Sequence, residues 1–120
     1  MRRFLALCLA FFLAAPAQAE PTTIKVGVLR GPHTRETLSI LDLPAADDVL
    51  AGALMGAADD NTTGKFTGQS FETIDVKLEE NEDAGAALER LAKDGARLVI
   101  ADLSAPRLLA AADRAKTLGA

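Results

Sequence analysis

The spacing of hydrophobic residues changes repeatedly along the chain, between the short runs or two-residue alternation typical of strands and the longer spacing typical of helices. Three segments rich in apolar or β-branched residues predict strands at 24–30, 71–80 and 98–101. Between and after them, apolar residues recur every three to four positions and predict helices beginning at Pro44, Asn81 and Ser104. The order β-α-β-α-β-α predicts an α/β fold with a parallel sheet.

The strand patterns also predict the order of the sheet. Ile74, Val76 and Leu78 alternate with charged residues, so segment 71–80 is expected to have one wet face and to lie at an edge. Segment 98–101 shows no alternation and is expected to be central, with both faces covered. Right-handed crossovers then favour the strand order 2-1-3 in a three-layer αβα arrangement.

Several single residues carry local predictions. Gly27 could admit a close neighbour to the first strand, but simple tolerance of glycine is the favoured interpretation. Gly52 and Gly56 weaken the first helix, and close packing of that helix on the sheet is their expected compensation. Asn81 is expected to cap the second helix, and Gly95 to end it in a left-handed conformation.

The first nineteen residues predict a secretory signal peptide rather than part of the fold. Arg2 and Arg3 precede an apolar run from Phe4 to Ala15, and small residues up to Ala19 provide a cleavage site. The run is too short to anchor the chain in a bilayer, so no membrane insertion of the mature chain is expected. The predicted location is the periplasm, and the mature domain is 20–120.

The composition of this mature domain excludes some classes of site and partner. The single cysteine, Cys8, lies in the signal segment, which excludes disulfides and cysteine metal sites from 20–120. The whole chain has a net charge of −4, and without Arg2 and Arg3 its 11 basic residues stand against 17 acidic ones, a balance of −6. This acidity argues against nucleic acid as a partner.

No motif for catalysis or for a cofactor is present. Gly31-Pro32-His33 lacks both the glycine-rich dinucleotide fingerprint and the phosphate-binding lysine. The neighbours of Ser104 do not form a nucleophile elbow. The acidic run 79–83 fits a strand exit and a helix cap better than a metal site. We therefore expect no enzyme activity, no cofactor and no metal.

The candidate ligand site is the carboxyl end of the strands, where open α/β sheets bind their ligands. The backbone N–H groups at the start of the last helix could bind a carboxylate, although Ser104 fits a plain helix cap equally well. His33 could touch a ligand or belong to a solvated loop. The candidate ligand-binding residues are Pro32, His33, Asp102, Leu103, Ser104 and Ala105.

Four segments in order resemble the type I periplasmic binding proteins of ABC transporters, in particular the branched-chain amino-acid type. They are the signal segment with 24–32, the helix 51–61, the acidic turn and helix 80–88, and the strand and turn 94–105. The chain departs from that family after Pro32, where His33, Thr34 and Arg35 replace small residues, and in the turn after Ala101. It is also similar to the divergent relatives encoded beside quinone-dependent alcohol oxidation systems.

The resemblance implies a periplasmic substrate-binding component of an ABC importer for amino acids or a related small acid. Its partners would be that small-molecule solute and the transporter permease. The resemblance also implies that 20–120 is the N-terminal part of the first of two lobes, so a truncated or split product is expected. The alternative is a small self-contained exported domain of flavodoxin-like shape that binds a protein partner.

Overall fold

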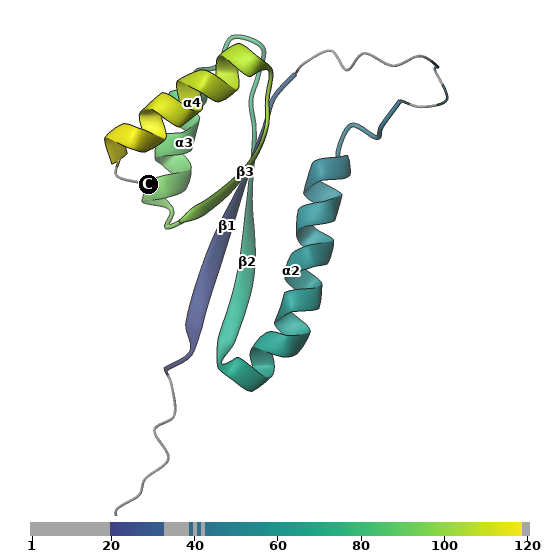
Figure 1. Cartoon of the computed structure of the whole chain (residues 1–120), viewed down its shortest axis with the longest axis vertical. Coiled ribbons are helices and arrows are strands. Elements are labelled where there is room, and N and C mark those ends of the chain that lie inside the picture. Colours follow the sequence, from purple (N-terminus) through teal and green to yellow (C-terminus); the bar gives the residue numbers. More distant parts are fainter. Residues whose placement is uncertain (1–19, 33–38, 40, 42, 119–120) are drawn as a thin grey trace, which may run out of the picture.

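The computed structural model describes residues 20–32, 39, 41 and 43–118, and its elements alternate along the chain as the sequence predicts (Figure 1). The strands are β1 (Thr22–Arg30), β2 (Gln69–Lys77) and β3 (Leu98–Asp102). The helices are α2 (Asp48–Thr67), α3 (Ala84–Lys93) and α4 (Ala105–Leu118). The predicted signal segment, 1–19, lies outside the described residues.

The three strands are parallel and lie in the order β2-β1-β3, which confirms the predicted order. Gly27 of β1 pairs with Ile74 on one side and with Val99 on the other. The expectation that 98–101 is central and covered on both faces is wrong, because β1 holds the middle of the described sheet. Leu98 is 58% exposed and Ile100 42% exposed, since α2 packs mainly against β2 and leaves this face of β3 bare.

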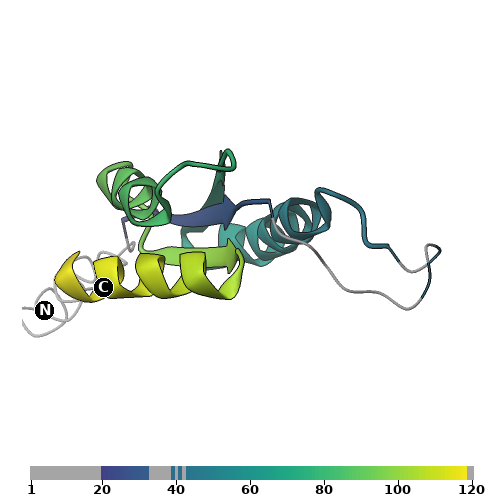
Figure 2. The same ribbon diagram turned by 90° about the horizontal axis from the view of Figure 1, so that it is seen from above.

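The helices lie on opposite sides of the sheet. α2 runs along one side, while α3 and α4 pack against each other on the other side (Figures 1 and 2). Side chains of a strand alternate between its faces, so the residues in register with Gly27 and Leu29 turn toward α3. These include Ile74, Val76 and Val99, which pack against the buried core.

The core lies between the sheet and the pair α3 and α4. Its fully buried large side chains on this side are Leu29, Leu78 and Leu91, and alanines of α3 and α4 fill the space between them. Gly27 allows close packing here, because an added Cβ would lie 3.0 Å from Leu91 Cδ1 and the leucine side chain would have to shift. The structure thus favours the close neighbour over simple tolerance of glycine: the missing side chain leaves room for Leu91.

The packing of α2 differs from its prediction. The helix begins at Asp48 rather than Pro44 and continues through Asn61 to Thr67, where Gly68 ends it with φ 71°. Apart from the helix's own backbone and the adjoining residues, no atom of the described chain lies within 4 Å of the Cβ positions of Gly52 and Gly56, so neither packs closely on the sheet. Gly64 has that role instead, because a Cβ there would overlap the Gln69 carbonyl oxygen at the turn into β2.

Asn61 fastens α2 to the outer side of β2. Its side-chain N–H donates to the Phe71 carbonyl (2.9 Å), and its oxygen accepts the Phe71 N–H (2.7 Å). One amide side chain thus satisfies both backbone groups of a strand residue. This pair of bonds joins the C-terminal half of α2 to β2.

The ends of α3 agree with the sequence in part. The N-cap is Asp83, whose carboxylate accepts the Gly85 N–H (2.8 Å), and not Asn81 as predicted. Gly95 has φ 92°, which confirms the left-handed end. Among the described residues, no helix is long and apolar enough to cross a membrane.

Candidate functional site

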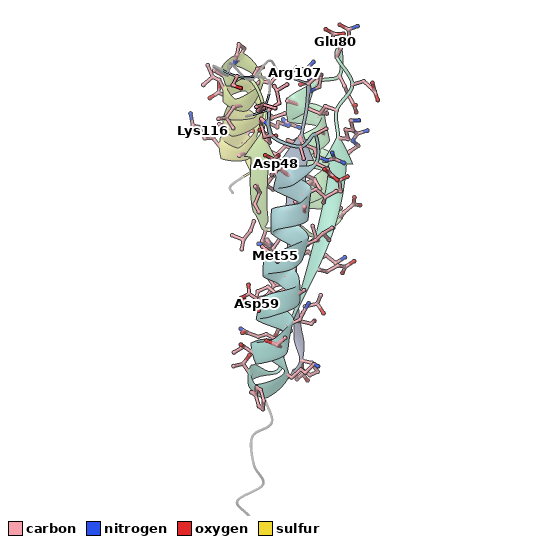
Figure 3. The ribbon with its side chains drawn as sticks, turned by 90° about the vertical axis from the view of Figure 1, so that its right-hand side faces the viewer. Asp48, Met55, Asp59, Glu80, Arg107 and Lys116 are labelled. Carbon is pink, nitrogen blue, oxygen red and sulfur yellow. The ribbon has the colours of Figure 1, made fainter. Side chains whose placement is uncertain are left out.

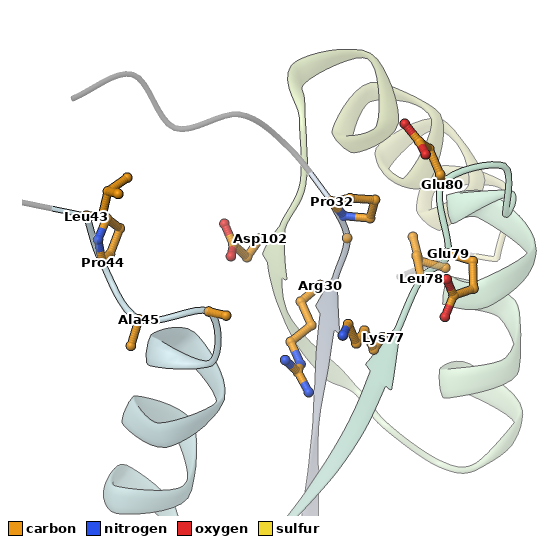
Figure 4. A pocket seen from close by; sticks show the side chains of 12 residues that line it. Arg30, Pro32, Leu43, Pro44, Ala45, Lys77, Leu78, Glu79, Glu80 and Asp102 are labelled. Atoms are coloured by element: carbon orange, nitrogen blue, oxygen red, sulfur yellow. The ribbon is translucent and has the colours of Figure 1, made fainter. Parts of the chain in front are cut away.

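A pocket of about 610 Å³ opens at the carboxyl end of the sheet (Figure 4). All three strands contribute their last residues to it, because parallel strands end on the same side. The segment that precedes α2 forms a further wall. The lining residues are Arg30, Gly31, Pro32, Leu43, Pro44, Ala45, Ala46, Lys77, Leu78, Glu79, Glu80 and Asp102.

Arg30 is held at the floor of this carboxyl-end pocket by Asp75. Its Nε and Nη2 each donate to a carboxylate oxygen of Asp75 at 2.8 Å. These hydrogen bonds lower the pKa of Asp75 and raise the pKa of Arg30, while partial burial opposes both effects. The two-point geometry fixes the guanidinium and balances its charge.

Lys77 is the second cation of the pocket lining. It stands in register with Arg30 on the neighbouring strand, so both side chains lie on the same face of the sheet. Within the described part of the chain, its ammonium has no hydrogen bond or ion pair, and its residue is exposed. Lys77 is therefore available to a negatively charged group that enters the pocket.

Acidic groups line other parts of the pocket. Asp102 ends β3 in register with Arg30, and its carbonyl accepts the Gly31 N–H (3.0 Å), which ties the two strand ends together. Glu79 and Glu80 follow β2 on the far side (Figure 4). The pocket thus presents both signs of charge, with apolar Pro32, Leu43 and Pro44 between them.

Arg107 supports this end of the sheet, although no sequence pattern singles it out. It projects from the first turns of α4 to the loop after β2, where Nη2 donates to the carbonyls of Glu80 and Glu79, the latter at 3.3 Å (Figure 3). Its Nη1 is buried beside Gly31 and has no hydrogen-bond partner among the residues that the structure describes. Only the fold brings these segments together, so no local pattern could have revealed the contact.

The loop between β2 and α3 is held from its other end as well. Glu82 accepts a hydrogen bond from Arg90 and another from the Glu79 N–H (3.2 Å), and these bonds lower the pKa of Glu82. Glu79 and Arg90 are both close to Glu82 in sequence, and the two bonds hold the Glu82 side chain against the loop. Together with Arg107, they fix the backbone that carries Glu79 and Glu80 into the pocket.

The sequence-predicted site residues fall into three groups. Pro32 and Asp102 line the pocket, whereas His33 lies outside the described residues. Leu103, Ser104 and Ala105 do not line it: Leu103 packs on the core, and the Ser104 carbonyl accepts the Leu108 N–H (2.9 Å), as a residue before a helix does. Arg30, Lys77 and Glu79 line the pocket but were not predicted as site residues.

Metal binding has no structural basis among residues 20–32, 39, 41 and 43–118. No group of three or more His, Cys, Asp or Glu side chains in these ranges could hold a metal ion. The acidic run 79–83 instead provides a helix cap, a bond to Arg90 and backbone acceptors for Arg107.

Comparisons with known proteins do not place the chain in a family. No protein-family profile, no curated protein and no solved structure matches it.

Proposed function

We propose that this chain is a periplasmic substrate-binding component of an ABC importer, with its carboxyl-end pocket as the solute site. The observation that carries the proposal is the pocket at the end of a parallel 2-1-3 sheet, the position at which open α/β folds bind ligands. The resemblance to type I periplasmic binding proteins supports the same function. In this proposal, α2, the sheet and the α3–α4 pair are the three layers of part of a first lobe.

The charges of the pocket suit a small solute such as an amino acid or a related acid. Lys77 would attract a carboxylate, with the fixed guanidinium of Arg30 beside it. Asp102 and Glu79 would attract an ammonium group, and the apolar wall formed by Leu43 and Pro44 would contact a short side chain. The proposal involves no catalytic step and no cofactor, and the solute would pass to a membrane permease.

Titration calorimetry on the full chain tests this proposal directly. The ligands are the natural amino acids and short mono- and dicarboxylic acids, each tested separately. At least one is expected to bind, and Lys77→Met is expected to weaken its binding by about tenfold, because a charge-assisted contact of roughly 1.5 kcal/mol is lost. Lys65→Met, at the far end of α2, is the matched control and should leave the affinity unchanged.

Two results would count against the proposal. If no ligand of the panel binds, the solute class is wrong. If Lys77→Met and Lys65→Met have equal affinities, the pocket is not the site. Ser104→Ala then examines the start of α4: a weaker affinity would assign Ser104 to the ligand, whereas an unchanged affinity would leave it as a helix cap.

A second function, an exported domain that binds a protein partner, is favoured by one observation. Leu98 and Ile100 expose large apolar side chains side by side on one face of β3. A self-contained domain of this kind should unfold in one cooperative transition when heated, as followed by circular dichroism. A broad, non-cooperative transition would argue against this second function.

A further inference from the structure

Arg107 meets the carboxyl-end pocket from behind. Its Nη1 lies beside Gly31, where a Cβ would be 3.0 Å from that nitrogen and 3.4 Å from the Cβ of Leu78. Its Nη2 donates to the carbonyls of Glu79 and Glu80. Arg107 itself does not line the pocket, but all of these neighbours do. The guanidinium therefore lies behind one part of the lining, the rear wall, which consists of Gly31, Leu78, Glu79 and Glu80.

The acidic part of the rear wall depends on Arg107 for its position. The Glu79 backbone is also tied to Glu82, whose carboxylate accepts the Glu79 N–H (3.2 Å). Glu80 has no such tie. Within the described ranges, the bond from Arg107 to the Glu80 carbonyl is the one hydrogen bond that this residue makes. Removing the guanidinium would therefore release Glu80 entirely and Glu79 in part.

The side chains of Glu79 and Glu80 bring unbalanced negative charge to the pocket (Figure 4). Both residues are exposed, and neither carboxylate has a hydrogen bond or an ion pair in the part of the chain that the structure describes. The charge of Arg30 is already balanced by Asp75, and its two-point contact fixes it in place. A cationic group of a solute would therefore be attracted toward the rear wall.

The guanidinium of Arg107 is held there at a cost to stability. Its Nη1 is buried without a hydrogen-bond partner among the described residues, and a buried charged donor without an acceptor is unfavourable. A lysine could donate to the same two carbonyls through one nitrogen, with no second nitrogen left unpaired. Buried polar atoms without partners are rare in native structures, so this one points to a function in the neighbouring pocket rather than to stability.

We propose that Arg107 is a positioning residue of the solute site, which sets Glu79 and Glu80 for a solute that bears an ammonium group. The arginine does not touch the solute, because it acts through the loop backbone that it holds. This inference rests on the proposed function and narrows it: amino acids should bind more tightly than carboxylic acids of the same carbon skeleton. The carboxylate of the solute stays with Lys77, as in the proposed function.

Titration calorimetry on the full chain with matched pairs of ligands tests this inference. The probes are each amino acid that binds and the acid of the same carbon skeleton, such as leucine with 4-methylpentanoate or glutamate with glutarate. Arg107→Met should weaken the amino acid by about tenfold, because a charge-assisted contact is misplaced, and should leave the acid within about twofold. Arg107→Lys, which can still donate to both carbonyls, should restore most of the difference.

Two further comparisons separate positioning from general support of the fold. Arg97→Met is the matched control, because it removes the same charge beside the other end of β3 and should change neither affinity. Once Glu79→Gln and Glu80→Gln are in place, Arg107→Met should have no further effect on amino-acid binding. Gly31→Ala, whose new Cβ would displace Nη1, should give the same selective loss, also if Arg107→Met fails to fold. Circular dichroism checks the fold of each variant.

Four results overturn the inference while the proposed function stands. They are an acid that binds the wild type as tightly as its amino acid, an amino-acid affinity that Arg107→Met leaves unchanged, equal losses for both members of a pair, and a loss that persists in the Glu79→Gln and Glu80→Gln background. If no ligand binds the wild type, the proposed function itself fails, and this inference fails with it.

Discussion

The two faces of the sheet differ in how much they bury. The face toward α3 and α4 covers Leu29, Leu78 and Leu91 completely. On the face toward α2, Val28 is buried, but Leu98 and Ile100 are exposed, as are Leu54 and Met55 of the helix itself. Because burial of apolar surface is the main favourable contribution to folding, most of the stability comes from the α3 side.

The difference has a physical origin in side-chain size and periodicity. α3 concentrates its apolar residues on one side, and small residues there and at Gly27 allow close approach to the strands. The large apolar residues of α2 are spread around the helix, and few can reach the sheet at once. α2 is held instead by Asn61 and by close packing at Gly64, both near its C-terminal end. Its N-terminal half should open more readily than α3.

Shortening a side chain on each face gives the largest expected contrast. Leu91→Ala should cost about 2–5 kcal/mol, because it leaves a cavity beneath Gly27 in the buried core. Met55→Ala, which removes an exposed side chain from α2, should change the free energy of unfolding by no more than about 0.5 kcal/mol. Denaturant unfolding measures both. Equal costs would show that the two faces contribute alike.

The glycines of α2 provide a second contrast. Gly64→Ala should destabilise the chain by about 1–3 kcal/mol, because the new Cβ meets the backbone of Gln69, which cannot easily move. Gly56→Ala should stabilise it by roughly 0.5–1 kcal/mol, because Gly56 is in an open part of a helix. Thermal unfolding of both variants measures the effects. A stabilising Gly64→Ala would contradict the close packing at that end of α2.

Removing the clamp on β2 should have a smaller effect. Asn61→Ala leaves the N–H and C=O of Phe71 without these partners and should cost about 1–2 kcal/mol. Thr63→Ala, an exposed change two residues along, is the control. Hydrogen exchange should become faster at Phe71 and through α2, while α3 stays protected. Equal exchange in both variants would mean that other contacts hold the helix.

Acid should destabilise both faces slightly, through their ion pairs. Asp75, Glu82 and Glu89 each have a folded-state pKa below the ordinary values of 3.8, 4.5 and 4.5, mainly because Arg30, Arg90 and Arg114 hydrogen-bond to them. The unfolded chain therefore takes up protons first. The stabilisation is present above those ordinary values and is lost as the pH falls through the lower folded-state values.

Single substitutions show how much of this loss of stability in acid comes from each face of the sheet. The Arg30–Asp75 pair is partly exposed, so Asp75→Asn should cost no more than about 1 kcal/mol at neutral pH. That cost should vanish in acid, where the wild-type carboxylate is protonated. Glu89→Gln reports in the same way on the contact between α3 and α4, together with the ion pair of Glu89 with Lys93 within α3 (3.0 Å). A cost that does not depend on pH would contradict the ion-pair explanation.

The sequence predicted where the candidate site lies, but only some of the residues that line it. The general rule for parallel sheets located it at the carboxyl end of the strands, and Pro32 and Asp102 indeed line the pocket there. Lys77 was read as one of the charged residues on the wet face of an edge strand, and Arg30 as the end of another strand. Nothing in the sequence says that these strand ends are in register, so their nearness could not be foreseen.

The sequence by itself determined the elements, their order and the parallel 2-1-3 sheet, because these depend on local periodicity, on glycine and proline, and on the handedness of crossovers. Tertiary structure alone decided which residues meet. Gly27 makes room for Leu91, Asn61 replaces a neighbouring strand at Phe71, and Arg107 reaches the loop after β2. Each contact joins segments distant in sequence, and its free energy depends on shape and distance, which composition does not encode.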